Sequence, residues 1–272
     1  MSETPSCFAF SSGGEPASNP RSHGAIGSSR APDGAGLVSI GTSHTVIVEN
    51  DPLRRIRRMR KGVFHSSRMI DQGLIEDQAR YKALFVTLTY ADDWDWRPDQ
   101  ISGYLTICRE WARRRGFSLR YVWVLELTKR GRPHYHVVFW VPRSLTMPKA
   151  DKRGWWRCGF TKTERARNPV GYLVKYASKG ASADSDMPFG ARLWGAGGLT
   201  CSQLRERSVH MAPMWVRQLV PISEGVRRKD GWWFNSTTGW GYRSPWDVRL
   251  RGDGRFELFF RGWTHDSVLI PV

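Results

Sequence analysis

The sequence predicts an α+β fold, with a central antiparallel β-sheet, flanking helices, a disordered N-terminal leader and a Trp-rich, β-containing C-terminal segment. The first observation is the order of the patterned segments, which runs strand, helix, strand, strand, strand, helix. The second is a short polar loop between two of those strands, which favours an antiparallel hairpin. The third is that 272 residues with 40% apolar content suffice for a packed core.

The N-terminal segment, residues 1–45, is dominated by Gly, Ser, Pro and Ala. Such a composition buries too little apolar surface to offset the entropy lost on ordering, so we expect a disordered leader. Residues 46–80 follow as a basic helical segment, because Leu53, Ile56 and Met59 recur every three residues with arginines between them. We expect those arginines to face either a phosphate backbone or solvent.

The next two elements are a strand and an amphipathic helix. Residues 84–90 are rich in β-branched and aromatic residues and alternate in polarity in their second half, which is typical of a strand. After Pro98, apolar residues recur at helical spacing, and Gly116 follows a basic last turn. The apolar positions of this helix are Ile101, Tyr104, Leu105, Cys108, Trp111 and Ala112.

Two further strands are expected to form a hairpin. Residues 120–127 and 134–141 are strand-like, and the short loop 128–133 that joins them contains glycine and proline. Residues 154–163 are expected to form another strand. Together with the helix that follows, these elements define a domain over residues 81–182.

The last helix of this domain has clear end signals. Asn168-Pro169 offers an N-cap and a first-turn proline, and a glycine follows Lys179. Beyond this helix, residues 183–272 form an Arg- and Trp-rich C-terminal extension. Residues 190–198 are loop-like, whereas residues 231–263 alternate aromatic and turn residues, which indicates hairpins.

The charge predicts a polyanionic partner. Lys and Arg number 42 against 25 Asp and Glu, a formal net charge of +17, and the basic residues recur along most of the chain. A field of this sign attracts phosphates. Several of the 14 Trp lie beside Arg, as in Trp155-Trp156-Arg157, and this mixture suits bases stacked next to phosphate contacts.

The expected compartment is the cytoplasm. The sequence has no apolar run long enough to cross a membrane and no secretory signal pattern, so we expect no membrane partner. Its four cysteines are far apart and form no Cys-x-x-Cys pair, which indicates neither a zinc ribbon nor a small disulfide scaffold. A reducing environment fits this cysteine usage best.

Two histidines and a glutamate are the candidate metal ligands. His134 and His136 are two residues apart on one predicted strand, where side chains of equal parity share a face. Glu126 is on the partner strand and is the only carboxylate in the apolar run 121–127. An acid in such a run is poorly solvated unless it is paired or metal-bound. Two imidazoles and a carboxylate suit a divalent cation such as Mg²⁺ or Mn²⁺.

The candidate nucleophiles are two tyrosines on the last helix. Tyr172 and Tyr176 are four residues apart, as are Lys175 and Lys179, so each pair lies along one side of the helix. A phenol has an ordinary pKa of about 10 and needs activation. A divalent ion that polarises the phosphate, with Lys175 or Lys179 beside the phenolate or the phosphate, would supply that activation. Which tyrosine attacks first is left open.

These segments resemble the three motifs of the HUH endonucleases, and within them the rolling-circle replication initiators of bacteriophages and plasmids. Residues Phe85 to Tyr90 are similar to the first motif, His134-Tyr-His136 to the metal motif, and Tyr172 to Lys179 to the third. Glu126 matches the third ligand of many initiators. The resemblance covers about residues 81–180. Two tyrosines, each followed three positions later by a lysine, are most similar to the two-tyrosine, gene A-like initiators of small single-stranded DNA phages.

The resemblance implies a palm-like antiparallel sheet that carries the metal ligands, with the tyrosine helix beside it. It also implies transesterification, in which a tyrosine attacks a phosphodiester of single-stranded DNA at a replication origin. The tyrosine becomes linked to the 5′ phosphate and frees a 3′ hydroxyl, with Mg²⁺ or Mn²⁺ as the cofactor. A host helicase and polymerase are expected partners in a bacterial cytoplasm.

Three alternatives stay open. Single-tyrosine initiators with Tyr-x-x-Lys fit either tyrosine, whereas relaxases, which usually carry a third histidine in the metal cluster, fit less well. A transposase of the same superfamily would share the nicking chemistry. A module of another class would bind single-stranded DNA or RNA on its sheet without cutting it, and the histidines and Glu126 would then be incidental.

Overall fold

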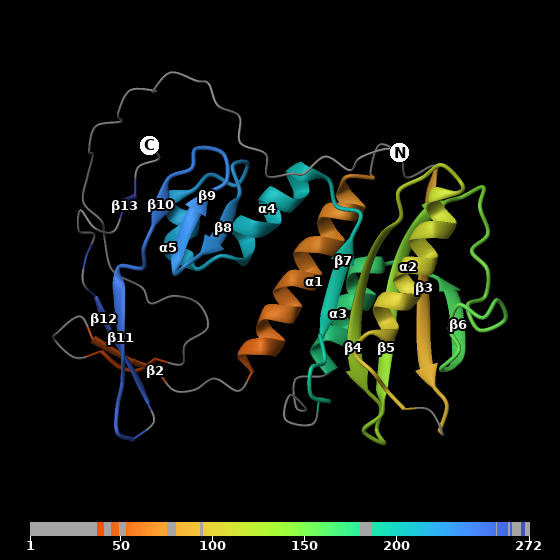
Figure 1. The fold of residues 1–272 in the computed structure, drawn as a ribbon, viewed down its shortest axis with the longest axis horizontal. Coiled ribbons are helices and arrows are strands. Elements are labelled where there is room, and N and C mark those ends of the chain that lie inside the picture. The colour runs from red at the N-terminus through yellow and green to blue at the C-terminus, as the bar shows by residue number, and fades with distance from the viewer. Residues whose placement is uncertain are drawn as a thin grey trace. The chain divides into compact units, whose positions relative to one another are not determined.

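The computed structural model describes residues 37–40, 45–48, 53–74, 80–92, 95–179, 187–253, 255–260, 262 and 268–269. The chain divides into two compact units. One unit is Pro52–Met211, and the other joins Met1–Asp51 to Ala212–Val272. Figure 1 labels the helices and strands of both units.

The unit Pro52–Met211 is built on a five-stranded antiparallel sheet with the strand order β6-β3-β5-β4-β7. Its strands are β3 (Tyr81–Tyr90), β4 (Arg120–Leu127), β5 (Pro133–Pro142), β6 (Gly159–Arg165) and β7 (Trp194–Gly197). Its helices are α1 (Arg54–Gln72), α2 (Gln100–Arg113), α3 (Pro169–Lys179) and α4 (Cys201–Met211). The predicted α+β class with a central antiparallel sheet is confirmed. The strand expected over residues 154–163 begins later, because residues 151–154 form turns.

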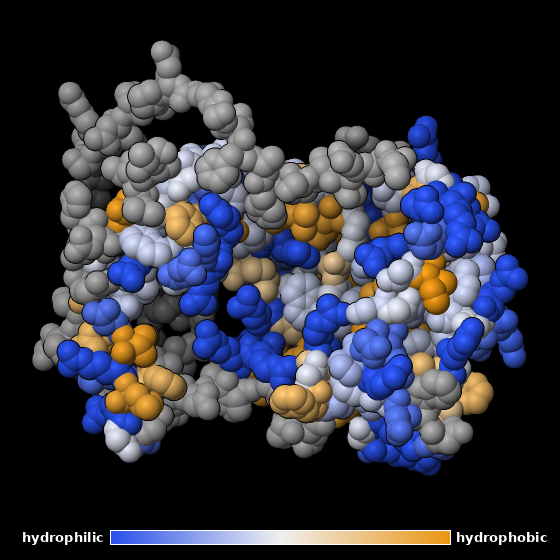
Figure 2. Space-filling view, viewed as in Figure 1, coloured by the Kyte–Doolittle hydropathy of each residue, from blue (hydrophilic) through white to orange (hydrophobic). Residues whose placement is uncertain are grey.

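Helices cover both faces of this sheet (Figure 1). Alternate residues of a strand point to opposite faces, so Val86 and Leu88 of β3 enter the core beneath α2, whereas Phe85 enters the core shared with α1 and α3. The visible outer side of α2 is mainly hydrophilic in Figure 2, as the amphipathic pattern requires. The sheet is therefore the middle layer of a three-layer domain.

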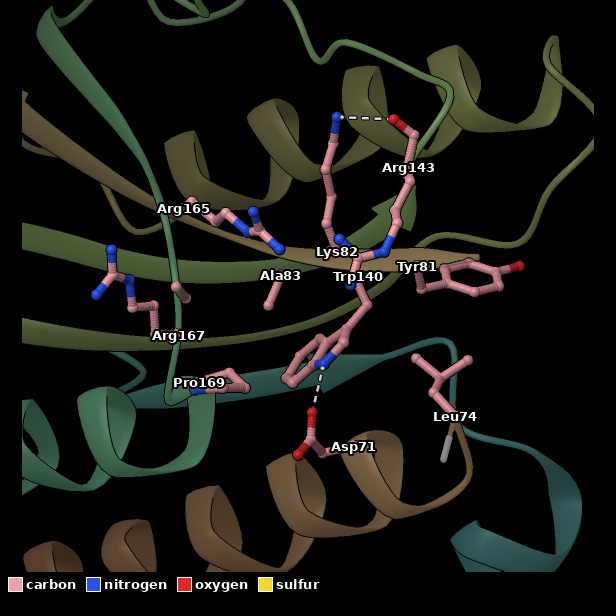
Figure 3. A pocket seen from close by; sticks show the side chains of 11 residues that line it. Asp71, Leu74, Tyr81, Lys82, Ala83, Trp140, Arg143, Arg165, Arg167 and Pro169 are labelled. Carbon is pink, nitrogen blue, oxygen red and sulfur yellow. Dashed lines mark hydrogen bonds between the residues drawn. The ribbon is translucent and has the colours of Figure 1, made fainter. Parts of the chain in front are cut away.

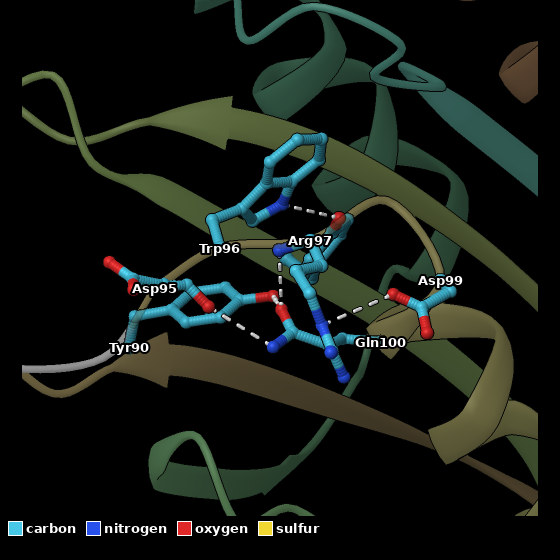
Figure 4. Close-up of polar contacts among 7 residues, drawn as sticks. Tyr90, Asp95, Trp96, Arg97, Asp99 and Gln100 are labelled. Carbon is cyan, nitrogen blue, oxygen red and sulfur yellow. Dashed lines mark hydrogen bonds and ion pairs between the residues drawn. The ribbon is translucent and has the colours of Figure 1, made fainter.

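The connection from β3 to α2 is held by side-chain hydrogen bonds (Figure 4). The Tyr90 hydroxyl donates to Oε1 of Gln100 at 2.8 Å, and the same oxygen accepts the backbone N–H of Arg97 at 2.8 Å. Nε1 of Trp96 donates to the Tyr135 hydroxyl at 2.9 Å. Tyr135 belongs to the α2 core and lies between two candidate ligands in the sequence. The network therefore fixes that stretch of β5 from the opposite face.

The edge strand β7 corrects a prediction, because the sequence indicates a loop over residues 190–198. Trp194–Gly197 pairs with β4 instead. A Cβ atom at Gly195 would meet the indole of Trp123, and one at Gly197 would meet the ring of Tyr121. Glycine is depleted in strands, which hides this strand from a composition argument, but here it is required for close approach.

The unit that joins Met1–Asp51 to Ala212–Val272 contains helix α5 (Met214–Leu219) and two four-stranded antiparallel sheets, ordered β1-β2-β12-β11 and β13-β10-β9-β8. Its strands are β1 (Leu37–Ile40), β2 (Thr45–Val48), β8 (Val226–Lys229), β9 (Trp232–Asn235), β10 (Gly241–Tyr242), β11 (Trp246–Leu250), β12 (Phe256–Phe260) and β13 (Val268–Leu269). The pairs β8–β9 and β11–β12 are the hairpins expected from residues 231–263.

The predicted N-terminal leader is described only in part. Strand β1 lies inside it, since Leu-Val-Ser-Ile is an apolar run that pairs with β2. Residues 1–36 and 41–44 lie outside the described residues. In the described part of the chain, no helix is long and apolar enough to span a membrane.

Candidate active site

The two histidines and the glutamate meet on one face of the sheet. The register places His134 of the central strand β5 opposite Glu126 on β4 and opposite Thr89 on β3. His136, two residues further along β5, lies opposite Thr87. Residues of this parity face the core of α1 and α3, so both imidazoles point to the side of the sheet that α3 covers.

His136 and Glu126 form the closest polar pair of the site. Nε2 of His136 lies 2.8 Å from Oε2 of Glu126, and the two side chains are only 5% and 15% exposed. Nδ1 of His136 lies 3.4 Å from the hydroxyl oxygen of Thr87. A buried carboxylate needs a partner, and the imidazole of His136 supplies one.

His134 has a different environment. Its Nε2 lies 3.0 Å from Oγ1 of Thr89, and its ring centroid lies 4.8 Å from that of His136. Burial and the neighbouring His136 lower the pKa of His134 to about 4, against the opposing effect of Glu126. The imidazole of His134 is therefore neutral at physiological pH, the form that can ligate a metal.

The donor set of the site fits a divalent cation in its chemistry, because two imidazoles and a carboxylate share one face. The ring nitrogens are engaged, however, since Nε2 of His136 bonds Glu126 and Nε2 of His134 bonds Thr89. Among the described residues, no three His, Cys, Asp or Glu side chains form a ready-made metal-binding group. A bound cation would have to replace the hydrogen bond between His136 and Glu126.

Helix α3 brings the two tyrosines to the histidines. The ring of Tyr176 stacks on that of His136, with centroids 3.7 Å apart and planes at 26°. The ring of Phe85 on β3 lies 5.4 Å from the rings of both Tyr172 and Tyr176. Tyr172 is 40% exposed, while Tyr176 is partly buried against the core. Both phenols therefore lie at the sheet face that carries the candidate ligands.

The rotation and the start of α3 follow from local sequence. Oδ1 of Asn168 accepts the backbone N–H of Gly171 at 2.8 Å, which is the capping contact expected from Asn168-Pro169. Leu173 and Ala177 are fully buried in the core against the sheet. These anchors fix which side of the helix the tyrosines occupy.

The segment from β3 to α3 carries every side chain of this arrangement. Residues 83–181 match the family of the replication-associated protein ORF2. The match supports a rolling-circle replication initiator family for these residues, which are called the ORF2 segment below. A comparison with curated proteins and one with solved structures found no match.

The two lysines of the ORF2 segment are not brought to the histidines. Lys175 is exposed on α3 and forms no hydrogen bond or ion pair with a described residue. The side chain of Lys179 lies outside the described residues. Their predicted contact with a phenolate or phosphate stays a prediction.

The structure adds three β3 residues of the ORF2 segment that the sequence analysis assigned no role. Phe85 contacts both tyrosines, and Thr87 and Thr89 contact the two histidines. Their odd-numbered spacing in the first motif is the signal that could have found them, because alternate strand residues share a face. Using it required knowing that β3 pairs with β5.

Proposed function

We propose that this protein initiates rolling-circle DNA replication by nicking and rejoining single-stranded DNA at an origin through a 5′-phosphotyrosine intermediate. The observation that carries the proposal is the stack of Tyr176 on His136, with centroids 3.7 Å apart, inside the segment that matches a replication-associated family. The formal net charge of +17 adds attraction for a polyanion.

Tyr172 or Tyr176 supplies the nucleophile in this proposal. The phenol oxygen forms a bond to phosphorus, and the bond from phosphorus to the 3′ oxygen breaks. The phenol proton leaves to solvent, and the 3′ oxygen gains a proton to become a hydroxyl. One phosphoester replaces another, so the reverse attack by a 3′ hydroxyl rejoins the strand and restores the tyrosine.

Glu126, His134 and His136 would hold a divalent ion, Mg²⁺ or Mn²⁺. A bound ion of this kind would polarise the scissile phosphate, which attack by a weakly nucleophilic phenol requires. The neutral state of His134 and the engaged but displaceable partners of His136 support this role. Thr89 and Thr87 would orient the two rings from β3.

The two tyrosines suit two successive transfers. They are one helical turn apart on the same side of α3, and both contact Phe85. One phenol can remain covalently joined to a 5′ end while the other attacks a second junction. This arrangement would release a displaced strand as a closed circle.

The decisive experiment incubates the full chain and Mn²⁺ with a supercoiled plasmid that carries the replicon encoding the protein. We expect nicked circles and a covalent protein–DNA adduct on the peptide with Tyr172 and Tyr176, neither of which forms in EDTA. Sequencing the trapped DNA end would define the origin. Binding of single-stranded DNA without a nick or an adduct would overturn the proposal in favour of a non-cutting module. Cleavage that requires transposon-end hairpins would favour a transposase.

A further inference from the structure

A basic cavity lies at the far end of the sheet face that carries the histidines. It has a volume of about 430 Å³, within the usual range for ligand sites, and the indole of Trp140 contributes to its lining. Trp140 shares the face of His136 and is four residues further along β5, which corresponds to about 14 Å at the rise of an antiparallel strand. The cavity is therefore separate from the histidine site but on the same face.

The cavity has an excess of positive charge. Its lining includes four cationic side chains, Lys82, Arg143, Arg165 and Arg167, against the single carboxylate of Asp71. Nζ of Lys82 donates to the backbone carbonyl of Arg143 at 3.1 Å. No carboxylate of the described residues forms an ion pair with Lys82, Arg165 or Arg167. Like charges held this close repel one another, and an anion in the cavity would relieve that repulsion.

Aromatic side chains complete the lining. Trp140 is 2% exposed, and its Nε1 donates to Oδ1 of Asp71 at 3.1 Å, so its indole is a fixed part of the wall. Figure 3 shows Tyr81 at one side of the cavity and Arg165 and Arg167 at the other. A ring beside several cations is the combination that holds a nucleotide, with the base on the ring and the phosphate on the cations.

Helix α3 links this cavity to the tyrosines. Pro169, its first residue, lines the cavity, and Tyr172 and Tyr176 follow three and seven residues later. At the rise of an α-helix, Tyr176 lies about 10 Å along the axis from Pro169. A strand anchored in the cavity can therefore pass along α3 to either phenol.

We propose that this cavity binds one nucleotide of the single-stranded DNA substrate, a few nucleotides from the phosphate that reacts. Arg165, Arg167 and Lys82 would hold the phosphate and Tyr81 would stack on the base. The choice of DNA as the ligand rests on the proposed function.

The test measures binding of a 5′-fluorescein-labelled 20-residue oligothymidylate to the full chain by fluorescence anisotropy, in EDTA and at several salt concentrations. Arg165→Gln with Arg167→Gln should lower the affinity roughly twenty-fold near 0.1 M salt and reduce the salt slope by about 1.4, the value for two lost phosphate contacts on a single strand. The matched control, Arg113→Gln with Arg114→Gln, removes the same charge from the exposed side of α2 and should bind like the wild type. An equal effect of both double variants would overturn the proposal.

Two further measurements separate the contributions. Tyr81→Leu should weaken binding by about five-fold or more without changing the salt slope, because it removes a stacking ring and no charge. A labelled hexa-aspartate peptide should bind weakly and equally to wild type and to the Arg165/Arg167 variant. A parallel loss for this peptide would assign the cavity to acidic peptides and overturn its assignment to DNA.

This test is independent of nicking because it contains no divalent ion. A chain that never forms an adduct, but whose Arg165/Arg167 variant loses affinity as expected, overturns the proposed function and leaves the cavity assignment standing. A chain that nicks, but whose cavity variant binds like the α2 control, overturns the cavity assignment alone.

Discussion

The ring of Tyr176 lies on the ring of His136, with 3.7 Å between centroids. This stack joins helix α3 to the central strand β5, so a phenol and an imidazole from segments 40 residues apart share one place. The same imidazole bonds Glu126 on the neighbouring strand. A phosphate that reached either histidine would also lie beside a tyrosine.

The two tyrosines should differ in their effect on the first cut. Phenylalanine keeps each ring and removes its oxygen, so the stack on His136 and the contacts with Phe85 survive. We expect Tyr176→Phe to reduce adduct formation by at least about a hundred-fold, as for loss of a nucleophile, because its ring is the closer one to the histidines. Tyr172→Phe should retain the first cut and lose the second transfer. Adduct formation on labelled single-stranded DNA in denaturing gels measures both, and a fully active double variant would contradict the mechanism.

Thr89 should orient His134 for its proposed role. Thr89→Val keeps the shape of the side chain and removes the hydroxyl that lies 3.0 Å from Nε2 of His134. Loss of such an outer contact typically costs about 10- to 100-fold in metal affinity, and we expect a loss of that size for Mn²⁺ by titration calorimetry. Thr163→Val is the control, because Thr163 on β6 is opposite Val86, whose side chain faces the α2 core. An affinity that rises in Thr89→Val would show instead that the hydroxyl competes with the metal for Nε2.

Local patterns predicted much of this site. The hairpin of β4 and β5 follows from two apolar strand runs and a short loop, and its register puts Glu126 opposite His134. Helix α3 begins and ends where the asparagine-proline pair and the following glycine indicated. Each of these features depends on residues close together in the sequence, where turn chemistry and capping act directly.

The missing parts depend on contacts between distant segments. Strand periodicity assigns Thr87 and Thr89 to one face of β3 but does not say that β3 pairs with β5. The edge strand β7 was wrongly interpreted as a loop because its glycines, required by the rings of Tyr121 and Trp123, are typical of loops. Neither the strand order nor a ring's close approach is encoded in a local window, so both required the structure.

Asn168 should stabilise the helix that carries the tyrosines. Its Oδ1 accepts the N–H of Gly171, and Asn168→Ala leaves that donor without its cap. We expect a loss of about 1 kcal/mol of helix stability, which corresponds to roughly five-fold faster hydrogen exchange of α3 amides. Asn168→Asp retains an acceptor and should exchange like the wild type. Equal exchange in all three proteins would show that packing of Leu173 and Ala177 alone holds α3.

Gly62 and Gly103 should respond to alanine with opposite signs. Both are helical, and alanine gains up to about 1 kcal/mol over glycine in a helix interior. Gly103 is exposed on α2 with no atom within 4 Å of an added Cβ, so Gly103→Ala should raise the free energy of unfolding by roughly that amount. Gly62 is buried on α1, where a Cβ would overlap the indole of Trp194 on β7. Overpacking of this kind costs about 1–3 kcal/mol, which exceeds the helical gain, so Gly62→Ala should lower stability in urea unfolding followed by circular dichroism. A Gly62→Ala protein as stable as Gly103→Ala would mean that Trp194 and the edge strand can move aside without cost.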